Sequence, residues 1–473
     1  MFGTSGIRGP VGSEVTAALA VALGRAIGSE RRPGGDPIET AVLGRDVRES
    51  GRTLSDALSA GLRETGTDVV RTGEASTPTI ARGVGVHDAD VGVSVTASHN
   101  PPADNGFKLW NPDGGAYRPA QRRRIEGRIE EESFDLVGAN ELGVETDSRA
   151  AVEAHRRALV AYGREGTAGE PLAGLSVVLD LGNGAGRVTA DALAALGAAV
   201  ETLNGQPDGR FPGRPSEPTA ETCGTLAATV GATDADLGLA HDGDADRLLA
   251  VDETGRFVPG DELLALFATR AAGPGDRVAV PVDTSRLVAD ALAAVDAEVV
   301  YTEVGDVHVA EATGRERVVF GGEPSGAWIH PDRTRCPDGP LAAVSLARLV
   351  ADRADAGGGG LSGLVAGFDS YPIVRDQLET DRKRAVMDAV ADAVRDRFGP
   401  ESESDATLTT LDGVRVDAED GWFLLRASGT QPLVRITAEA TDRDRRDELL
   451  GIARGVLEDA TDRVDDRSSS PGS

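Results

Sequence analysis

Lysine is nearly absent from this chain of 473 residues: Lys108 and Lys383 are the only two, and every other basic residue is arginine. Acidic residues outnumber basic residues by 78 to 49, which gives a formal net charge of −29. This shortage of positive charge argues against nucleic acid or an anionic membrane surface as a partner. An acidic, hydrated surface suits a salt-adapted cytoplasm, although a genome whose codons favour arginine would give the same composition.

Cysteine and long apolar stretches are also scarce. Cys223 and Cys336 are the only cysteines, too few for a disulfide framework or a cysteine-based zinc site. No apolar run approaches the ~20 residues that a membrane-spanning helix needs. Met1 leads directly into FGTSGIRG, without the pattern of a secretory signal peptide. We therefore expect a cytoplasmic protein.

Residues 91–110 (VGVSVTASHNPPADNGFKLW) combine a predicted strand with an unusual turn. The alternating β-branched run, Val91 to Val95, predicts a buried strand. The small, polar residues TASHNPP follow, and their two prolines cannot continue a ladder. Ser98 is therefore expected at a strand end in a proline-clamped turn, as a nucleophile would be presented. A lone loop serine is more often a turn former or a cap.

Lys108 lies in the same segment. In a chain with so little lysine, its retention close to the serine turn indicates that an ammonium group is needed there, with a chance survivor as the alternative. His99, the neighbour of Ser98, is expected to orient the turn rather than to act as a base.

Three carboxylates alternate in HDGDADR, residues 241–247: Asp242, Asp244 and Asp246. In an extended loop, alternate side chains can point to one side, and carboxylate oxygens are the ligands that a hard divalent cation prefers. Strand-like runs on both sides favour an organised loop. The bidentate glutamate of an EF-hand is missing. A solvated turn is the alternative reading in so acidic a protein.

Two more turns carry polar groups. GEPSG, residues 322–326, is a tight turn with a carboxylate and a hydroxyl. RASGTQPLVR, residues 426–435, places the hydroxyls of Ser428 and Thr430 between two arginines, which suits a phosphate group. A glycine-rich turn at residues 181–187 resembles a dinucleotide-binding loop, but arginine stands in place of its third glycine, so a structural turn is favoured.

A strand–helix–strand pattern occurs three times, at residues 40–73, 175–205 and 277–305. Such a unit cannot bury its apolar face alone, and it predicts a mixed sheet with helices on both faces. Each unit is followed by one of the polar loops. We therefore expect an α/β fold of three similar mixed-sheet domains plus a smaller C-terminal α+β domain, arranged around a central cleft.

Four successive glycines within residues 352–363 indicate a flexible boundary before the last domain. The expected domains are residues 1–148 with the serine turn, 149–252 with the aspartate loop, 253–363 with the GEPSG turn and 364–465 with the RASGTQP loop, followed by a disordered tail at 466–473.

The motifs FGTSGIRG, TASHNP, DGDADR, GEPSG and RASGTQP, in this order along the chain, resemble those of the α-D-phosphohexomutase family, which includes phosphoglucomutase, phosphomannomutase and phosphoglucosamine mutase. The resemblance implies that Ser98 carries a phosphoryl group and that Mg²⁺ is held by Ser98, Asp242, Asp244 and Asp246. It implies catalytic roles for Ser98, Lys108, Arg247, His99 and Arg8. The implied substrate-binding residues are Asp306, His308, Glu323, Ser325, Arg426, Ser428, Gly429, Thr430 and Arg435.

The chain departs from the family pattern at two positions. Many relatives have histidine directly after the GxxSG turn, where this chain has Ala327, so His308 or His330 is expected to substitute. Gln431 replaces the usual glutamate of the RASGTQP loop, at a position that phosphate binding does not require.

The resemblance implies interconversion of hexose 6-phosphate and hexose 1-phosphate through a bound hexose 1,6-bisphosphate. Glucosamine phosphate is the favoured substrate, and phosphomannomutase or phosphoglucomutase activity is the alternative. A metal-dependent phosphatase and a non-catalytic sugar-phosphate sensor are remoter alternatives. The expected partners are small sugar phosphates, on a monomer or a homodimer.

Overall fold

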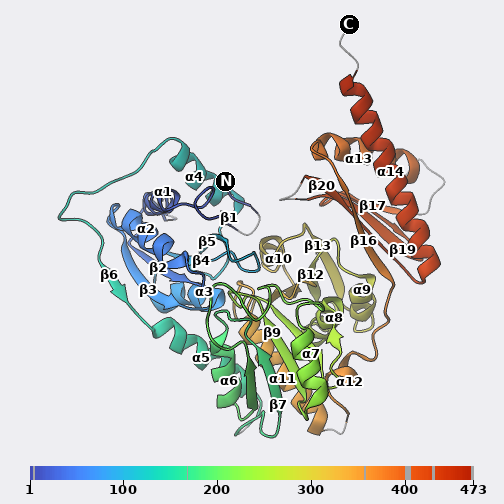
Figure 1. The fold of residues 1–473 in the computed structure, drawn as a ribbon, viewed down its shortest axis with the longest axis horizontal. Coiled ribbons are helices and arrows are strands. Elements are labelled where there is room, and N and C mark those ends of the chain that lie inside the picture. The colour runs from blue at the N-terminus through green and yellow to red at the C-terminus, as the bar shows by residue number, and fades with distance from the viewer. Residues whose placement is uncertain are drawn as a thin grey trace. The chain divides into compact units, whose positions relative to one another are not determined.

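The computed structural model describes residues 1–3, 6–32, 34–167, 169–355, 358–399, 406–428 and 432–469 (Figure 1). The chain divides into two compact units. The first consists of Met1–Ala271 and Gly305–Gly367, and the second of Ala272–Val304 and Phe368–Ser473. Each unit is described by itself.

The N-terminal domain is built on a six-stranded sheet of order β1-β5-β4-β2-β3-β6. Its strands are β1 (Ile7–Pro10), β2 (Thr40–Arg45), β3 (Asp68–Glu74), β4 (Val91–Val95), β5 (Asp104–Trp110) and β6 (Glu145–Asp147). β2 lies parallel to β3 and β4, whereas β5 is antiparallel to β4 and β1. The sheet is therefore mixed, and it brings the ends of β2 and β4 to the same edge.

Helices α1 (Ala17–Gly28), α2 (Gly51–Arg63), α3 (Thr77–Val86) and α4 (Pro119–Glu130) belong to this domain. The side chains of Leu23, Leu54 and Leu58 pack with Val91 and Val93 in one buried core. The helices α1 and α2 cross closely because glycines face each other's backbone: a Cβ at Gly61 would lie 2.2 Å from the carbonyl oxygen of Val21.

The second domain has a five-stranded mixed sheet of order β11-β10-β9-β7-β8. Its strands are β7 (Ser176–Asp180), β8 (Ala199–Leu203), β9 (Leu237–His241), β10 (Leu248–Asp252) and β11 (Phe257–Val258), and its helices are α5 (Ala150–Gly163), α6 (Arg187–Ala195) and α7 (Gly224–Ala232). β9 and β10 are antiparallel and completely buried. The six residues between them are the aspartate loop, residues 242–247.

The third α/β region supplies elements to both units. In the first unit these are α8 (Gly260–Ala271), α10 (Asp306–Ala312), β14 (Val318–Gly322), β15 (Trp328–Ile329), α11 (Gly339–Asp355) and α12 (Leu361–Val365). In the second unit these are β12 (Arg277–Pro281), α9 (Arg286–Ala293) and β13 (Glu298–Thr302). β12 and β13 are parallel, and β14 and β15 are antiparallel.

The C-terminal domain has an antiparallel sheet of order β16-β20-β19-β18-β17. Its elements are β16 (Ile373–Glu379), α13 (Lys383–Phe398), β17 (Thr407–Thr409), β18 (Val414–Ala418), β19 (Gly421–Ala427), β20 (Leu433–Ala440) and α14 (Arg443–Ser469). Figure 1 shows α13 and α14 on the same face of the sheet, where Val390 and Leu457 pack with Phe423 in one core. Three mixed α/β domains and a C-terminal α+β domain are thus confirmed.

Helix α14 reaches further than the tail composition indicates. Disorder is expected from residue 466, but α14 continues to Ser469, because Ala460 is buried in the core and Arg382 pairs with Asp465 at 3.1 Å. The remaining tail residues, 470–473, lie outside the described residues. None of the helices in the described part of the chain has both the length and the apolar composition needed to cross a bilayer.

Candidate active site

Ser98 lies in a strained, buried turn between β4 and β5. Its φ of 52° is in the left-handed region, which costs a non-glycine residue about 1–3 kcal/mol and is typical of functional sites. The backbone N–H of Ser98 donates to Thr96 Oγ1 at 2.8 Å, and Ser98 Oγ donates to Asp242 Oδ2 at 2.7 Å. The predicted serine and the first predicted aspartate are therefore in direct contact.

Arg48 binds the backbone of the serine turn. This completely buried guanidinium donates to the carbonyl oxygens of Ser98 at 2.8 Å, Asn100 at 2.7 Å and Asp104 at 2.9 Å, and it pairs with Asp46 at 3.0 Å. The sequence reasoning missed it. Because β2 and β4 are parallel neighbours, the segment after β2 meets the segment after β4, and this pairing was the signal that could have identified Arg48.

The aspartate loop gathers its three carboxylates at one point. One oxygen from each of Asp242, Asp244 and Asp246 lies within 4.8 Å of the others, and all three side chains are buried. Ala245, between them, has a φ of 55°. Among the described residues, the Oδ1 atoms of Asp244 and Asp246 are buried without a hydrogen-bond partner. Inward-facing, unsatisfied carboxylate oxygens fit a hard divalent cation.

Lys108 on β5 lies against this cluster. Its Nζ donates to Asp244 Oδ2 at 3.0 Å and also to Asp246 Oδ2. Burial opposes the charged ammonium, but the carboxylates of Asp244 and Asp246 outweigh it and raise the pKa of Lys108 above its usual range. The lysine is therefore a permanent cation at neutral pH.

The three carboxyl groups differ in their acidity. Burial and the neighbouring charges of Asp246 and Asp244 raise the pKa of Asp242. For Asp244, burial is opposed by Lys108 and by a 2.6 Å hydrogen bond from Thr77 Oγ1, and its pKa is lowered. Thr77 begins α3, and the sequence reasoning missed it too. A cation that joined the cluster would relieve the repulsion among the carboxylates.

Cationic side chains surround His99. Burial and the charges of Arg247, Arg8 and Lys108 lower the pKa of His99 to about 2, so its imidazole is neutral at physiological pH. Arg247 also donates its backbone N–H to Asp242 Oδ1 at 3.2 Å and its Nη1 to Glu217 at 3.1 Å. The predicted catalytic residues of the first unit thus lie in one neighbourhood.

The GEPSG turn is fixed to the aspartate loop by its backbone. Arg247 and Ala327 form an antiparallel bridge, and the N–H of Leu248 donates to the carbonyl of Gly326 at 2.9 Å. Gly326 has a φ of 96°, and a Cβ there would lie 2.8 Å from the carbonyl oxygen of Leu248. Trp328 Nε1 donates to the same oxygen at 2.9 Å. The turn and the loop therefore form one rigid backbone structure.

Glu323 links this turn to the start of α10. Its Oε1 accepts the N–H of Gly305 at 2.8 Å, and its Oε2 accepts Ser325 Oγ at 3.2 Å. His308 lies on α10, while the ring of His330 packs edge-on against Phe320 with centroids 5.1 Å apart. This aromatic packing favours a structural role for His330 rather than the substitution suggested by its sequence position.

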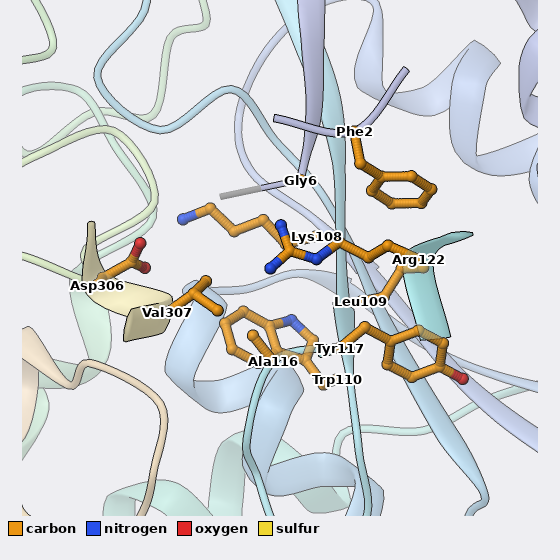
Figure 2. A pocket seen from close by; sticks show the side chains of 10 residues that line it. All are labelled: Phe2, Gly6, Lys108, Leu109, Trp110, Ala116, Tyr117, Arg122, Asp306 and Val307. Atoms are coloured by element: carbon orange, nitrogen blue, oxygen red, sulfur yellow. The ribbon is translucent and has the colours of Figure 1, made fainter. Parts of the chain in front are cut away.

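A small pocket adjoins Lys108 (Figure 2). Figure 2 shows the side chains of Lys108 and Arg122 extending toward Asp306, with Phe2 and Tyr117 lining the other side. Asp306, predicted as a sugar ligand, therefore lies close to Lys108, the predicted catalytic lysine. Burial lowers the pKa of Arg122, although Asp306 opposes this shift.

The start of α11 packs closely against the backbone of the aspartate loop. A Cβ at Gly339 would lie 2.5 Å from the carbonyl oxygen of Arg247, so only glycine allows this approach. The preceding Asp338 is buried and pairs with Arg82 of α3 at 2.9 Å and with His155 of α5 at 3.2 Å. These contacts join helices from all three α/β domains, and no sequence motif indicated them.

In the second unit, a pocket lies over one face of the C-terminal sheet. The predicted phosphate ligands Arg426 and Arg435 line it from opposite positions on β19 and β20. Arg375 on β16 lines it as well, and the sequence reasoning missed this residue. Ser428 is buried after β19, whereas Gly429, Thr430 and Gln431 lie outside the described residues.

Lys383, the other lysine of the chain, contacts this loop. Its Nζ donates to the carbonyl oxygen of Ser428 at 2.5 Å. Both lysines therefore adjoin a predicted functional loop. The scarcity of lysine in the sequence indicated a functional position for Lys108, and it applied equally to Lys383, which the sequence reasoning did not consider.

Comparisons with known proteins agree with this arrangement. The chain matches the sequence models of phosphoglucomutase/phosphomannomutase alpha/beta/alpha domain I at residues 1–136, domain II at 162–255, domain III at 259–370 and the C-terminal domain at 377–451. Probable phosphoglucosamine mutase from Methanopyrus kandleri is 44% identical over 97% of this chain and 98% of its own. Its counterpart from Methanothermobacter thermautotrophicus is 42% identical over 97% and 98%.

A crystal structure of a phosphoglucomutase/phosphomannomutase family protein from Burkholderia thailandensis has the same fold, with a TM-score of 0.83 and 29% identity over 98% of both chains. The four domain matches cover most of the chain in the expected order. The protein therefore belongs to the phosphoglucomutase/phosphomannomutase family and is an enzyme, an intramolecular phosphotransferase.

Proposed function

We propose that the enzyme interconverts glucosamine 6-phosphate and glucosamine 1-phosphate, with Ser98 as the phosphoryl carrier. The observation that carries this proposal is the contact of 2.7 Å between Ser98 Oγ and Asp242 Oδ2, inside a buried cluster that also holds Lys108. A serine fixed beside a divalent-cation site and a permanent cation is suited to phosphoryl transfer, in which positioning and charge stabilisation supply most of the catalysis.

The residues of the first unit are assigned different roles in phosphoryl transfer. As a sugar hydroxyl oxygen attacks the phosphorus, the bond between phosphorus and Ser98 Oγ breaks, and the hydroxyl proton passes to the freed serine oxygen. The bound 1,6-bisphosphate then turns end for end and transfers its other phosphoryl group to Ser98, which gives up its proton in turn. Lys108 and Arg247 stabilise the negative charge on the transferring group. His99, neutral and enclosed by Arg247 and Arg8, orients the turn. Arg48 keeps the carbonyl of Ser98 fixed, so the hydroxyl does not need to be positioned anew in each step.

Asp242, Asp244, Asp246 and the Ser98 oxygen would hold Mg²⁺. When bound, the ion supplies Lewis-acid stabilisation of charge on the transferring phosphoryl group. The buried, unpartnered Oδ1 atoms of Asp244 and Asp246 support this assignment.

Substrate recognition is assigned to both units. Glu323 and Ser325, together with Asp306 and His308, are proposed to bind the sugar hydroxyls, because a carboxylate and a hydroxyl held at fixed positions reject a wrong epimer by about 1–3 kcal/mol per unpaired polar group. The phosphate that is not transferred is assigned to Arg426, Ser428, Gly429, Thr430 and Arg435.

The amino sugar is favoured by the relatives: several at 40–44% identity over nearly the whole chain are named probable phosphoglucosamine mutase. The Burkholderia thailandensis structure, described by the family name phosphoglucomutase/phosphomannomutase, favours neutral hexose phosphates as the second candidate. Small sugar phosphates as ligands are consistent with a cytoplasmic enzyme.

Two measurements test the proposal. Intact mass and peptide mapping of the purified protein should locate one phosphate on Ser98, and the Ser98→Ala variant should lack it. Coupled assays with the 1-phosphates of glucosamine, glucose and mannose should give the highest kcat/KM for glucosamine. A phosphate on another residue would overturn the carrier assignment, and a higher kcat/KM for mannose or glucose would overturn the substrate.

A further inference from the structure

The arginine pocket of the second unit takes its shape from three neighbouring strands. Arg375 on β16 is paired with Thr437 on β20, and Arg426 on β19 is paired with Arg435 on β20. In antiparallel strands, paired and alternate residues share a face. Three guanidinium groups therefore project from one face of the sheet, the face opposite to that covered by α13 and α14.

Two aspartates line the same pocket, Asp283 and Asp376. The side chain of Asp376 pairs with Arg454 of α14, so Asp283 is the carboxylate that faces the arginines. It lies in the segment between β12 and α9, which reaches this face of the sheet through the packing of Val282 against Trp422 and Leu424. Burial raises the pKa of the Asp283 carboxyl, while the charges of Arg426 and Arg375 oppose that shift. A negative charge here weakens the attraction of the pocket for a phosphate, so phosphate binding alone gives no reason for it.

We propose that Asp283 binds the 2-ammonium group of the amino sugar and so selects glucosamine over neutral hexoses. The inference rests on the function proposed above. A carboxylate set among arginines provides adjacent sites of opposite charge, and α-glucosamine 1-phosphate carries adjacent groups of opposite charge: a phosphate on C1 and an ammonium on C2. The ammonium would donate a charge-assisted hydrogen bond to Asp283, while the arginines bind the phosphate.

The contact depends on which end of the sugar occupies the pocket. C2 is bonded directly to C1, so the ammonium lies beside the 1-phosphate. C6 lies at the far end of the molecule, so the ammonium cannot reach Asp283 when the 6-phosphate is bound by the arginines. Asp283 therefore discriminates in only one of the two binding orientations. It should affect glucosamine 1-phosphate more than glucosamine 6-phosphate.

The test is the isosteric Asp283→Asn variant, assayed in both directions with glucosamine phosphates and with glucose 1-phosphate. A lost hydrogen bond between charged groups corresponds to about tenfold in affinity. We expect KM for glucosamine 1-phosphate to rise about tenfold, KM for glucosamine 6-phosphate to change less than about threefold, and KM for glucose 1-phosphate to stay equal or fall. Asp283→Glu should restore part of the preference.

Asp376→Asn is the matched control, since Asp376 lines the same pocket but pairs with Arg454. It should leave the preference unchanged. An equal change in KM for glucosamine and glucose 1-phosphates in Asp283→Asn would overturn the role of Asp283. If the wild-type enzyme does not turn over glucosamine phosphates, the proposed function fails instead, so the two failures are distinguishable.

Discussion

The carboxylate cluster of the first unit and the arginine pocket of the second unit use charge in opposite ways. In the first, Lys108 and three aspartates are almost completely buried and bonded to one another. In the second, the guanidinium groups of Arg375 and Arg435 are exposed at the surface of the sheet. A buried, internally bonded site is preorganised for a reaction at one fixed atom, whereas exposed cations can bind and release a ligand at low cost in desolvation.

The backbone shows the same contrast. Ser98 and Ala245 in the first unit have left-handed φ values of 52° and 55°, held by surrounding contacts. The arginines of the second unit lie on regular strands. Backbone strain and burial therefore occur together where phosphoryl transfer is proposed, whereas the arginines proposed to bind the other phosphate need no strained backbone. The following predictions test that division.

The largest effect is expected from Ser98→Ala. Loss of the nucleophile should lower kcat by at least about 10⁴-fold, while calorimetry should still detect sugar-phosphate binding, because the arginine pocket is unchanged. Arg435→Ala should do the opposite and raise KM more than it lowers kcat. Turnover by Ser98→Ala within about tenfold of the wild type would remove the distinction between the two regions.

Lys108→Met should destabilise the first unit strongly. Removing one partner of a buried ion pair leaves uncompensated carboxylates and costs about 3–5 kcal/mol, measurable by urea unfolding. Lys383→Met is the matched control: Lys383 is only partly buried and its Nζ donates to the carbonyl oxygen of Ser428, so about 1 kcal/mol is expected. Similar losses for the two variants would show that the burial of Lys108 has no special energetic consequence.

Divalent cations should stabilise the first unit alone. At a Mg²⁺ concentration of about 100 times Kd, binding to the folded state contributes about 2.7 kcal/mol. Thermal unfolding followed by hydrogen exchange should show this gain in the first unit after EDTA-treated protein receives Mg²⁺. Asp246→Asn should largely abolish it. Equal protection of both units, or an unchanged gain in Asp246→Asn, would contradict the proposed ligand set.

Acid should also act on the first unit, because all six histidines of the sequence belong to it. Burial lowers the pKa of His330 to about 4. As the pH falls, His330 is therefore protonated in the unfolded chain at a higher pH than in the folded protein. Neutral His330 contributes fully to the free energy of unfolding above pH ~6.5, and this contribution is lost as the pH falls toward about 4.

For this half-buried ring, the loss should be on the order of 2 kcal/mol. The His330→Phe variant can keep the edge-on packing against Phe320. Between pH 6.5 and 4, its free energy of unfolding should fall by about 2 kcal/mol less than that of the wild type. Chemical unfolding at both pH values measures the difference. Parallel curves for the two proteins would show that His330 does not titrate on unfolding.

The smallest effect is expected from Arg375→Gln. An exposed guanidinium contributes about 1 kcal/mol or less to an ionic contact, so KM for sugar 1-phosphates should rise about threefold to fivefold with kcat nearly unchanged. Lowering the ionic strength should enlarge the difference from the wild type. A fall in kcat instead of a rise in KM would assign Arg375 to the chemical step.

Much of the architecture could be predicted from the chain itself. The three strand–helix–strand repeats indicated the α/β domains, and the alternating aspartates and the proline-clamped serine indicated the site, because each pattern is local in sequence. Arg48, Thr77 and Asp338 were missed because their roles depend on which elements become neighbours. Arg48 reaches the serine turn only because β2 pairs with β4, and Asp338 meets His155 only when three domains pack together.

Lys383 and Arg375 were missed for different reasons. The rarity of lysine applied equally to Lys383, so that signal was available in the composition. Arg375 gave no such signal, since arginine is abundant and the residue reaches the pocket only through the pairing of β16 with β20.

The bridge between Arg247 and Ala327 has a consequence for altering this enzyme. Because the GEPSG turn shares its backbone hydrogen bonds with the loop that carries the aspartates, the turn cannot be exchanged for that of a relative as a separate piece. A transplanted turn would have to fit Leu248 and Trp328 as well, or it would shift the carboxylates beneath it. For the sugar-binding role proposed for this turn, a change of preference is therefore expected from replacing single side chains within the turn rather than from loop exchange.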